Sequence, residues 1–268
     1  MRLILFLLCL IQATASANGT DSFLLIRSIP LEARLLSVDE LGNAYVVKSD
    51  NSLLRLNASG DSSAFYRSVQ HGAIGRVDPT NPLNVLVYFP DFSRVVMLDR
   101  MLSPKNDIDL RRMNVPVISA IGASADGNIW IYDRFNARVR KIDEVLNPLV
   151  ESNDLRQELH MVPESNFLVE RDWKLYLADS LKGIFTFDRY GSYINTISIA
   201  GVSKLQVTRN QLVYRQRDSL LVWDMDLMQS RSLKLPGEGW EIIDAAANNG
   251  RLYILYNNRL DIFSIAKE

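Results

Sequence analysis

Short apolar runs alternate with polar turns along most of the chain. The clearest unit begins with the pair Asp126-Gly127, continues through the β-forming run 128–133 and, after a four-residue gap, reaches a second run over 138–143. An aspartate-glycine pair favours a tight turn, and short runs of branched and aromatic residues favour strands. The unit therefore predicts consecutive antiparallel strands joined by short turns.

The same unit recurs, and this internal repeat is the strongest signal in the sequence. Six equivalent apolar positions follow one another at intervals of 37 to 46 residues. A period of about 42 residues is typical of a four-stranded propeller blade; solenoid coils are usually shorter, and a β-sandwich would not repeat turn and strand six times. We therefore predict an all-β fold, a six-bladed β-propeller of four-stranded blades. The equivalent positions are Tyr45, Leu86, Trp130, Tyr176, Val213 and Tyr253.

Small residues and the order of the runs indicate how such a ring is built. The segments 119–124 and 245–247 consist mainly of small residues, which suit the crowded innermost strand of a blade. The last repeat has only three strands before the chain ends, whereas the run 22–29 precedes the first repeat without a blade of its own. We expect 22–29 to complete the sixth blade, because this pairing removes exposed strand edges.

The first 17 residues are typical of a secretory signal peptide. Arg2 is followed by the apolar run 3–11 and by the small residues 15–17, a basic start, a short apolar core and an A-x-A cleavage site. The run is shorter than the roughly 20 residues that span a bilayer. Cleavage after Ala17 would remove Cys9, the only cysteine. We expect a mature domain over 18–268 in the bacterial periplasm or, alternatively, secreted, without direct membrane insertion.

The charge balance argues against one class of partner. The chain carries 30 basic and 31 acidic residues, a formal net charge of −1, and 47% of its residues are hydrophobic. Proteins that bind nucleic acid normally show a basic excess or a basic stripe. We therefore expect one ordinary globular domain that binds no nucleic acid.

Two of the repeats resemble a known family. The segment 126–143, with its Asp turn, Arg138-Val139 and closing Ile142-Asp143, resembles an NHL-type repeat, and 173–191 is similar. The resemblance implies an NHL-like six-bladed propeller. It implies little about activity, because that family includes protein-binding, RNA-binding, lyase and sugar-metabolising members, and a fold does not fix a function.

The residues that could carry chemistry are few. His71 and His160 are expected on loops of one face, where an NHL-like lyase would need them near a common metal, but catalytic zinc usually takes three protein ligands. A calcium ion in the central channel would need several oxygen ligands that converge on it. Most of the aspartates near the inner strands are better explained by turns, because Asp-Gly and Asp-Pro pairs are common in turns. We predict no catalytic residue, metal or cofactor. The aspartates that follow or lie within inner strands are Asp39, Asp78, Asp126, Asp172 and Asp244.

One face of the predicted propeller carries aromatic and arginine side chains in loops whose turns do not require them. This face carries the loop between the second and third strands of each blade and the connections between blades. Aromatic residues and arginine dominate binding hot spots. We expect a non-catalytic module, a scaffold or an accessory subunit of a cell-envelope or secretion complex, that binds a protein partner such as an outer-membrane or envelope complex. The alternative is a metal-dependent lactonase- or lyase-type enzyme or a small-ligand-binding protein. The candidate partner-binding residues are Phe89, Phe92, Arg112, Arg134, Phe135, Arg217, Trp240 and Tyr256.

Overall fold

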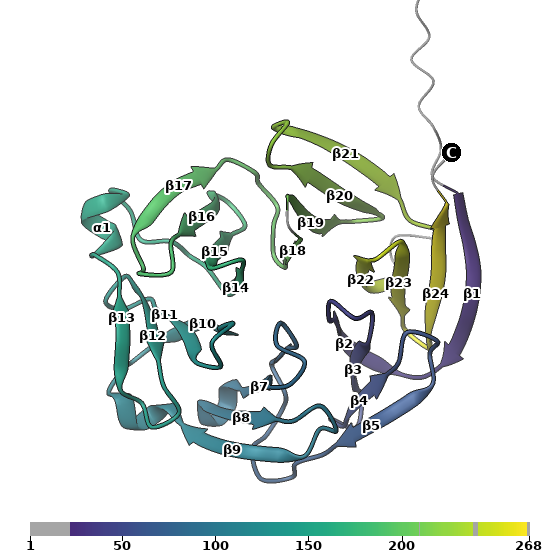
Figure 1. Cartoon of the computed structure of the whole chain (residues 1–268), viewed down its shortest axis with the longest axis horizontal. Coiled ribbons are helices and arrows are strands. Elements are labelled where there is room, and N and C mark those ends of the chain that lie inside the picture. Colours follow the sequence, from purple (N-terminus) through teal and green to yellow (C-terminus); the bar gives the residue numbers. More distant parts are fainter. Residues whose placement is uncertain (1–21, 209, 238–240, 267–268) are drawn as a thin grey trace, which may run out of the picture.

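The protein forms a ring of six four-stranded antiparallel sheets, shown in Figure 1. The structure is a computed structural model and describes residues 22–208, 210–237 and 241–266. The predicted fold class, a six-bladed β-propeller of four-stranded blades, is confirmed. The proposed signal peptide lies outside the described residues.

The first three blades follow the chain from the innermost to the outermost strand. Blade 1 contains β2 (Ala33–Val38), β3 (Ala44–Lys48), β4 (Leu53–Leu56) and β5 (Ser62–Tyr66). Blade 2 contains β6 (Arg76–Asp78), β7 (Val85–Phe89), β8 (Arg94–Leu98) and β9 (Pro104–Asp109). Blade 3 contains β10 (Ile118–Ala123), β11 (Ile129–Asp133), β12 (Arg138–Ile142) and β13 (Pro148–Glu151).

Blades 4 and 5 keep the same order, and blade 6 differs in its outer strand. Blade 4 contains β14 (Phe167–Arg171), β15 (Lys174–Asp179), β16 (Gly183–Phe187) and β17 (Tyr193–Ile197). Blade 5 contains β18 (Gln206–Val207), β19 (Gln211–Gln216), β20 (Ser219–Asp224) and β21 (Gln229–Lys234). Blade 6 contains β22 (Ile242–Asn248), β23 (Arg251–Tyr256), β24 (Arg259–Ala266) and β1 (Ser22–Pro30). The short helical turns are η1 (Pro90–Phe92), η2 (Leu110–Met113) and α1 (Leu155–Glu158).

The ring closes through β1, which pairs antiparallel with β24 at the outer edge of blade 6 (Figure 1). The ring of Phe23 in β1 meets the ring of Phe263 edge-on at 6.5 Å. Arg27 also reaches blade 1, where its Nη1 lies 2.6 Å from Oδ1 of Asp61. The predicted completion of the last blade by the N-terminal strand is therefore confirmed.

The core consists of apolar clusters, one between each pair of neighbouring blades. The cluster between blades 3 and 4 contains Trp130, which is fully buried. Each large apolar side chain buried in this way contributes roughly 1.5–3 kcal/mol. The prediction that Trp130 fills the space between neighbouring sheets is confirmed.

The runs of small residues predicted for innermost strands lie in β10 and β22, where neighbouring inner strands approach closely. A Cβ atom on Gly122 in β10 would lie 2.9 Å from the Asp78 carboxylate of blade 2 and 2.8 Å from Cδ1 of Leu168 in blade 4. A larger residue at Gly122 would therefore push the inner ends of three blades apart. No helix in the described ranges is long and apolar enough to cross a membrane.

Candidate functional site

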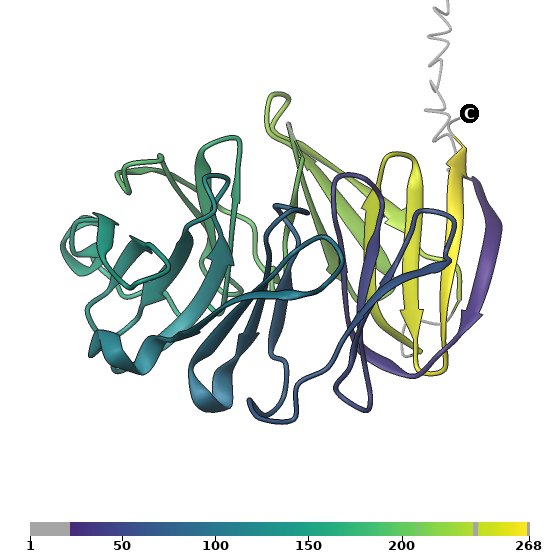
Figure 2. The same cartoon turned by 60° about the horizontal axis from the view of Figure 1, so that its bottom comes forward.

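The loops of the propeller open on two faces at opposite ends of the strands, as Figure 2 shows. In an antiparallel blade, the loop between the second and third strands lies opposite the loops that join the other strands. We call the face with these middle loops and the segments between blades the connection face. The opposite face is called the hairpin face.

The connection face displays aromatic, aliphatic and arginine side chains over blades 2 and 3. Phe92 is 43% exposed and Phe135 is 64% exposed. Val117, which no sequence pattern indicated, is 45% exposed. Arg112 and Arg134 are also exposed. We call these five residues the aromatic-arginine patch. The exposure expected of Phe92, Arg112, Arg134 and Phe135 is observed, and their role in binding stays a prediction.

Backbone hydrogen bonds tie the loops of this patch to one another. The amide of Leu110 donates to the carbonyl of Ser93 at 2.9 Å, which fixes η2 against the loop of blade 2. The amide of Arg134 donates to the carbonyl of Val117 at 3.1 Å, which fixes the loop of blade 3 against the segment before β10. The patch therefore lies on loops that support each other from one blade to the next.

The turn that carries Phe135 is built on a buried carboxylate. Asp133 is fully buried, and it accepts hydrogen bonds from the backbone amide of Asn136 at 3.0 Å and from its side-chain amide at 2.7 Å. Arg134 forms an ion pair with Glu164 at 2.7 Å, and both side chains are largely exposed. Exposed ion pairs contribute only about 0–1 kcal/mol, so Arg134 could exchange Glu164 for a carboxylate of a partner at small cost.

A second carboxylate positions the arginines of η2. Asp109 accepts hydrogen bonds from the backbone amide of Arg111 at 3.1 Å and from its guanidinium at 2.6 Å. These hydrogen bonds hold the pKa of Asp109 at about 2, well below its usual range. Leu110 is buried and anchors the turn. Arg112 is exposed and forms no ion pair within the described part of the chain.

Two residues predicted for the exposed face are buried instead. Phe89 is 0% exposed and Tyr256 is 3% exposed. Phe89 is the last residue of β7, and its ring meets the imidazole of His71 at 5.2 Å. Tyr256 is the last residue of β23, and its hydroxyl donates to the carbonyl of Pro236 at 2.7 Å. The expectation that Phe89 and Tyr256 are exposed on this face is wrong, because the strands extend to include them and the segments between blades cover them.

The remaining two candidates lie elsewhere. Arg217 is exposed in the turn between β19 and β20, on the connection face but over blade 5. Trp240 lies outside the described residues. The structure therefore places four of the candidates on the connection face over blades 2 and 3, and it places Arg217 over blade 5.

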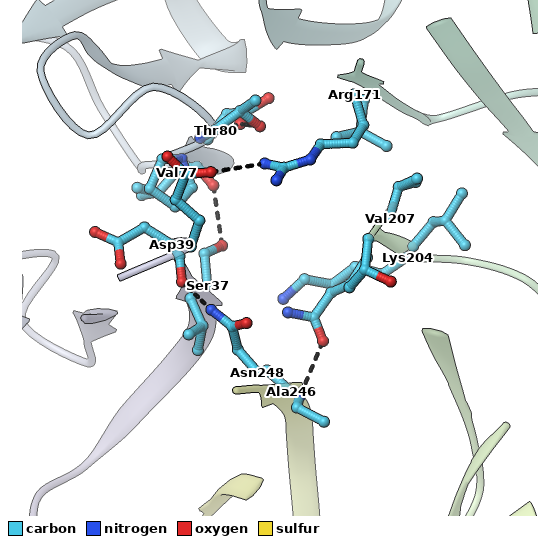
Figure 3. A pocket seen from close by; sticks show the side chains of 18 of the residues that line it. Ser37, Asp39, Val77, Thr80, Arg171, Lys204, Val207, Ala246 and Asn248 are labelled. Carbon is cyan, nitrogen blue, oxygen red and sulfur yellow. Dashed lines mark hydrogen bonds and ion pairs between the residues drawn. The ribbon is translucent and has the colours of Figure 1, made fainter. Parts of the chain in front are cut away.

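A cavity of about 380 Å³ opens at the hairpin face, where the inner strands converge (Figure 3). Arg171 of blade 4 points across it, and its Nη1 lies 3.1 Å from Oε2 of Glu40 in blade 1. Arg76 of blade 2 lies over the ring of Phe167 at 3.9 Å from the ring centre, and burial lowers the pKa of this guanidinium. Arg171 and Glu40 therefore join opposite blades of the ring, whereas Arg76 and Phe167 join blades 2 and 4.

The carboxylates around this cavity build their own turns. Asp39 accepts hydrogen bonds from the backbone amide and the side-chain amide of Asn43, both at 2.8 Å. Asp78 accepts them from the amide of Thr80 at 3.0 Å, from its hydroxyl at 2.6 Å and from the amide of Ala123 at 3.0 Å. Because these oxygens are already engaged, they do not fit the converging ligands of a calcium site. No group of three or more metal-ligating side chains is found across the described ranges.

The two histidines have different surroundings. Both lie on segments between blades, at the connection face, as expected. Nε2 of His71 lies 3.2 Å from Oδ2 of Asp107, and this side chain is largely buried. His160 is exposed after α1, with a φ of 54°. The structure therefore shows no ligand set shared by His71 and His160.

A larger cavity, of about 810 Å³, opens at the connection face among blades 5, 6 and 1. Its lining includes Arg34, Arg215 and Arg217, and also Lys204, whose ammonium lies 2.5 Å from Oδ2 of Asp244. Lys204 lines both cavities, which are therefore adjacent. Arg34 and Lys204 were not predicted from the sequence. The sequence feature that could have indicated them is a charged residue within or next to an inner strand whose other residues are mainly apolar or small.

Comparisons with known proteins support the fold and leave the activity open. No protein-family model matches the sequence, and the comparison with curated proteins gives no significant match. Virginiamycin B lyase from Staphylococcus aureus is similar with a TM-score of 0.63 and 9% identity, over 91% of this chain and 100% of that one. BamB from Moraxella catarrhalis is similar with a TM-score of 0.50 and 12% identity, over 91% and 98%. The Neurospora crassa Pan2 WD40 domain is similar with a TM-score of 0.61 and 11% identity, over 94% and 98%. At these identities the likeness shows a β-propeller fold alone.

Proposed function

We propose that this chain is an exported, non-catalytic interaction module that binds a protein partner in the cell envelope through its connection face. The observation that carries the proposal is the aromatic-arginine patch. It combines two exposed phenylalanines and an exposed valine with two arginines, on loops that hydrogen-bond to one another. Exposed apolar side chains rimmed by polar ones are typical of protein interaction sites, and arginine and aromatic residues contribute most to binding.

The fixed conformation of the loops that carry the patch also supports binding. The buried Asp133 fixes the turn below Phe135, and Leu110 anchors the turn that carries Arg112. A partner that docks there would therefore meet loops that are already ordered, and ordering loops on binding is one of the main costs of association. Both phenylalanines remain partly accessible, Phe135 more than Phe92, whose ring lies close to Gly72 in the segment between blades 1 and 2.

The cellular setting is part of the same proposal. The basic start, the apolar run 3–11 and the A-x-A site support export and cleavage after Ala17. The NHL-like character of 126–143 and 173–191 supports a propeller of the NHL class. Fractionation of cells and N-terminal sequencing would test the export step. A mature chain that begins at Asn18 in the periplasmic or extracellular fraction is expected, and a cytoplasmic chain with an intact N-terminus would contradict export.

Site-specific photo-crosslinking tests the binding surface. A photoreactive phenylalanine analogue replaces Phe135 in the full-length protein, and the same analogue replaces Leu83 as a control. Leu83 is 66% exposed on the hairpin face, so it matches Phe135 in exposure. We expect a discrete protein adduct from position 135 and none from position 83. Equal adducts at both positions, or none at position 135, would count against the proposed surface.

A further inference from the structure

The cavity at the connection face among blades 5, 6 and 1, which we call the arginine cavity, lies beside the shortest inner strand of the ring. The inner strand β18 has only two residues, whereas β10 has six and β22 has seven. It also belongs to the shortest interval of the repeat, 37 residues from Tyr176 to Val213. The cavity of about 810 Å³ lies beside this short strand and β22, with Gln206 and Ala245 among its lining residues. Its size lies within the range of about 300–1,000 Å³ that is typical of ligand sites.

Three guanidinium groups line this cavity without a carboxylate partner in the described ranges. Arg34 donates to the side-chain oxygen of Asn51 at 2.8 Å. Arg215 donates to two backbone carbonyls, that of Arg217 at 2.5 Å and that of Ile243 at 3.1 Å. Arg217 is exposed, and no side-chain contact of its guanidinium with a carboxylate is found there. Neutral oxygens satisfy hydrogen bonds of these groups but do not neutralise their charge.

The acidic residues of the cavity are already paired with other cations. Asp244 pairs with Lys204 at 2.5 Å, and Asp218 pairs with Lys234. The lining therefore contains four cationic side chains against two carboxylates, although the chain as a whole carries a formal charge of −1. Burial lowers the pKa of Arg34, because its charge is removed from water without a nearby anion. A bound anion would compensate this charge.

We propose that the arginine cavity binds an acidic segment of a protein partner through carboxylate side chains. Arginine recognises carboxylates with two parallel hydrogen bonds, which suits a site lined by guanidinium groups. Arg34 belongs to blade 1, whereas Arg215 and Arg217 belong to blade 5, on the other side of β22. A peptide that carries several carboxylates can reach both sides, and the cavity opens on the same face as the aromatic-arginine patch. The inference rests on the proposed function, because the acidic segment belongs to a protein partner.

Fluorescence anisotropy with a fluorescein-labelled hexaglutamate peptide and the full mature protein tests this site. The test variant is Arg34→Gln with Arg217→Asn. Glutamine can still donate to Asn51, and asparagine tolerates the φ of 53° at position 217. The control variant is Arg100→Gln with Lys174→Gln, which removes two charges from exposed residues of the hairpin face. We expect the test variant to bind at least about tenfold more weakly and the control variant to bind within about twofold of wild type.

Three results would overturn the inference: equal binding of a hexaglutamine peptide, equal weakening by the control variant, or displacement by free glutarate or inorganic phosphate at the same anion concentration as the peptide. The last result would indicate a site for small anions. Circular dichroism of both variants checks that they fold.

The proposed function fails separately, because it depends on the adduct at position 135. Peptide binding without that adduct would contradict the patch, and the adduct without peptide binding would contradict only the arginine cavity.

Discussion

The indole nitrogen of Trp130 in blade 3 donates a hydrogen bond to Oε2 of Glu170 in the inner strand of blade 4. Both side chains are buried. The hydroxyl of Ser124 donates to the same carboxylate oxygen at 2.7 Å, and the ammonium of Lys141 lies 4.9 Å from the centre of the indole ring. One aromatic side chain thus joins two blades through apolar packing and through a buried polar contact.

Replacing Trp130 should separate these two contributions. Trp130→Ala leaves a cavity between blades 3 and 4, and it should lower the free energy of unfolding by about 3–5 kcal/mol. Trp130→Phe keeps most of the packing but removes one donor to Glu170, so it should cost less, about 1–3 kcal/mol. Urea denaturation followed by circular dichroism measures both values. A loss of less than about 1 kcal/mol for Trp130→Ala would contradict the role of this residue in the core.

Deleting residues 22–30 should open the ring. β24 would keep β23 but lose its outer antiparallel partner, and Phe263 would lose its contact with Phe23. An unpaired apolar strand edge promotes aggregation, so the truncated protein should aggregate or unfold over a broad transition. Light scattering and thermal melts measure these effects. Leu24→Ser is a matched control, because Leu24 lies in β1 but is 70% exposed, and this variant should melt like wild type. Unchanged melting of the truncated protein would contradict closure by β1.

Stability should depend on the contact between Asp109 and Arg111 in a specific pH window. The Arg111 guanidinium holds the pKa of Asp109 at about 2 in the folded protein, below the ordinary value of about 3.9. A carboxyl whose folded pKa is lowered stabilises the protein above its unfolded pKa, and this contribution is lost as the pH falls through the folded pKa. The melting temperature of wild type should therefore exceed that of Arg111→Gln at pH 6. The difference should shrink below about pH 4 and disappear only below about pH 2.

Arg112→Gln provides the control for this measurement. Arg112 occupies the same turn, but it forms no ion pair in the described part of the chain. The difference in melting temperature between wild type and Arg112→Gln should therefore stay constant from pH 6 to pH 2. A difference for Arg111→Gln that is equally constant would contradict the effect of Arg111 on the Asp109 carboxyl.

Sequence alone predicts features that depend on local pattern. The turn at Asp126-Gly127 and the strand with Trp130 define the blade, and counting repeats leaves the run 22–29 as the only strand available for the sixth blade. The exposure of Phe135 also follows from its place in a turn between two short strands. These features could be predicted because each depends on neighbours along the chain or on the number of repeats.

Other features depend on packing between blades and could not be read from the pattern. Phe89 and Tyr256 stand at strand ends, where one residue decides between burial and exposure, and segments from elsewhere cover both. The arginine cavity is lined by residues from blades 5, 6 and 1, which include Arg34 and Lys204 and are far apart in the sequence. The number of residues between two strands does not reveal how much space they leave beside a third.

The double variant Arg134→Ala with Phe135→Ala should separate binding from folding. Both residues are exposed, and the buried Asp133 that builds their turn is unchanged, so the melting temperature should stay within a few degrees of wild type. Surface substitutions usually alter stability by less than about 0.5 kcal/mol.

Binding of the partner captured by crosslinking should weaken at least about tenfold, which needs only about 1.4 kcal/mol. Leu83→Ala with Arg100→Ala is the matched control on the hairpin face and should bind normally. A chelator such as EDTA should change neither property, because no metal takes part in the proposed contact. Normal binding by the double variant, or loss of binding on chelation alone, would contradict a contact made by Arg134 and Phe135.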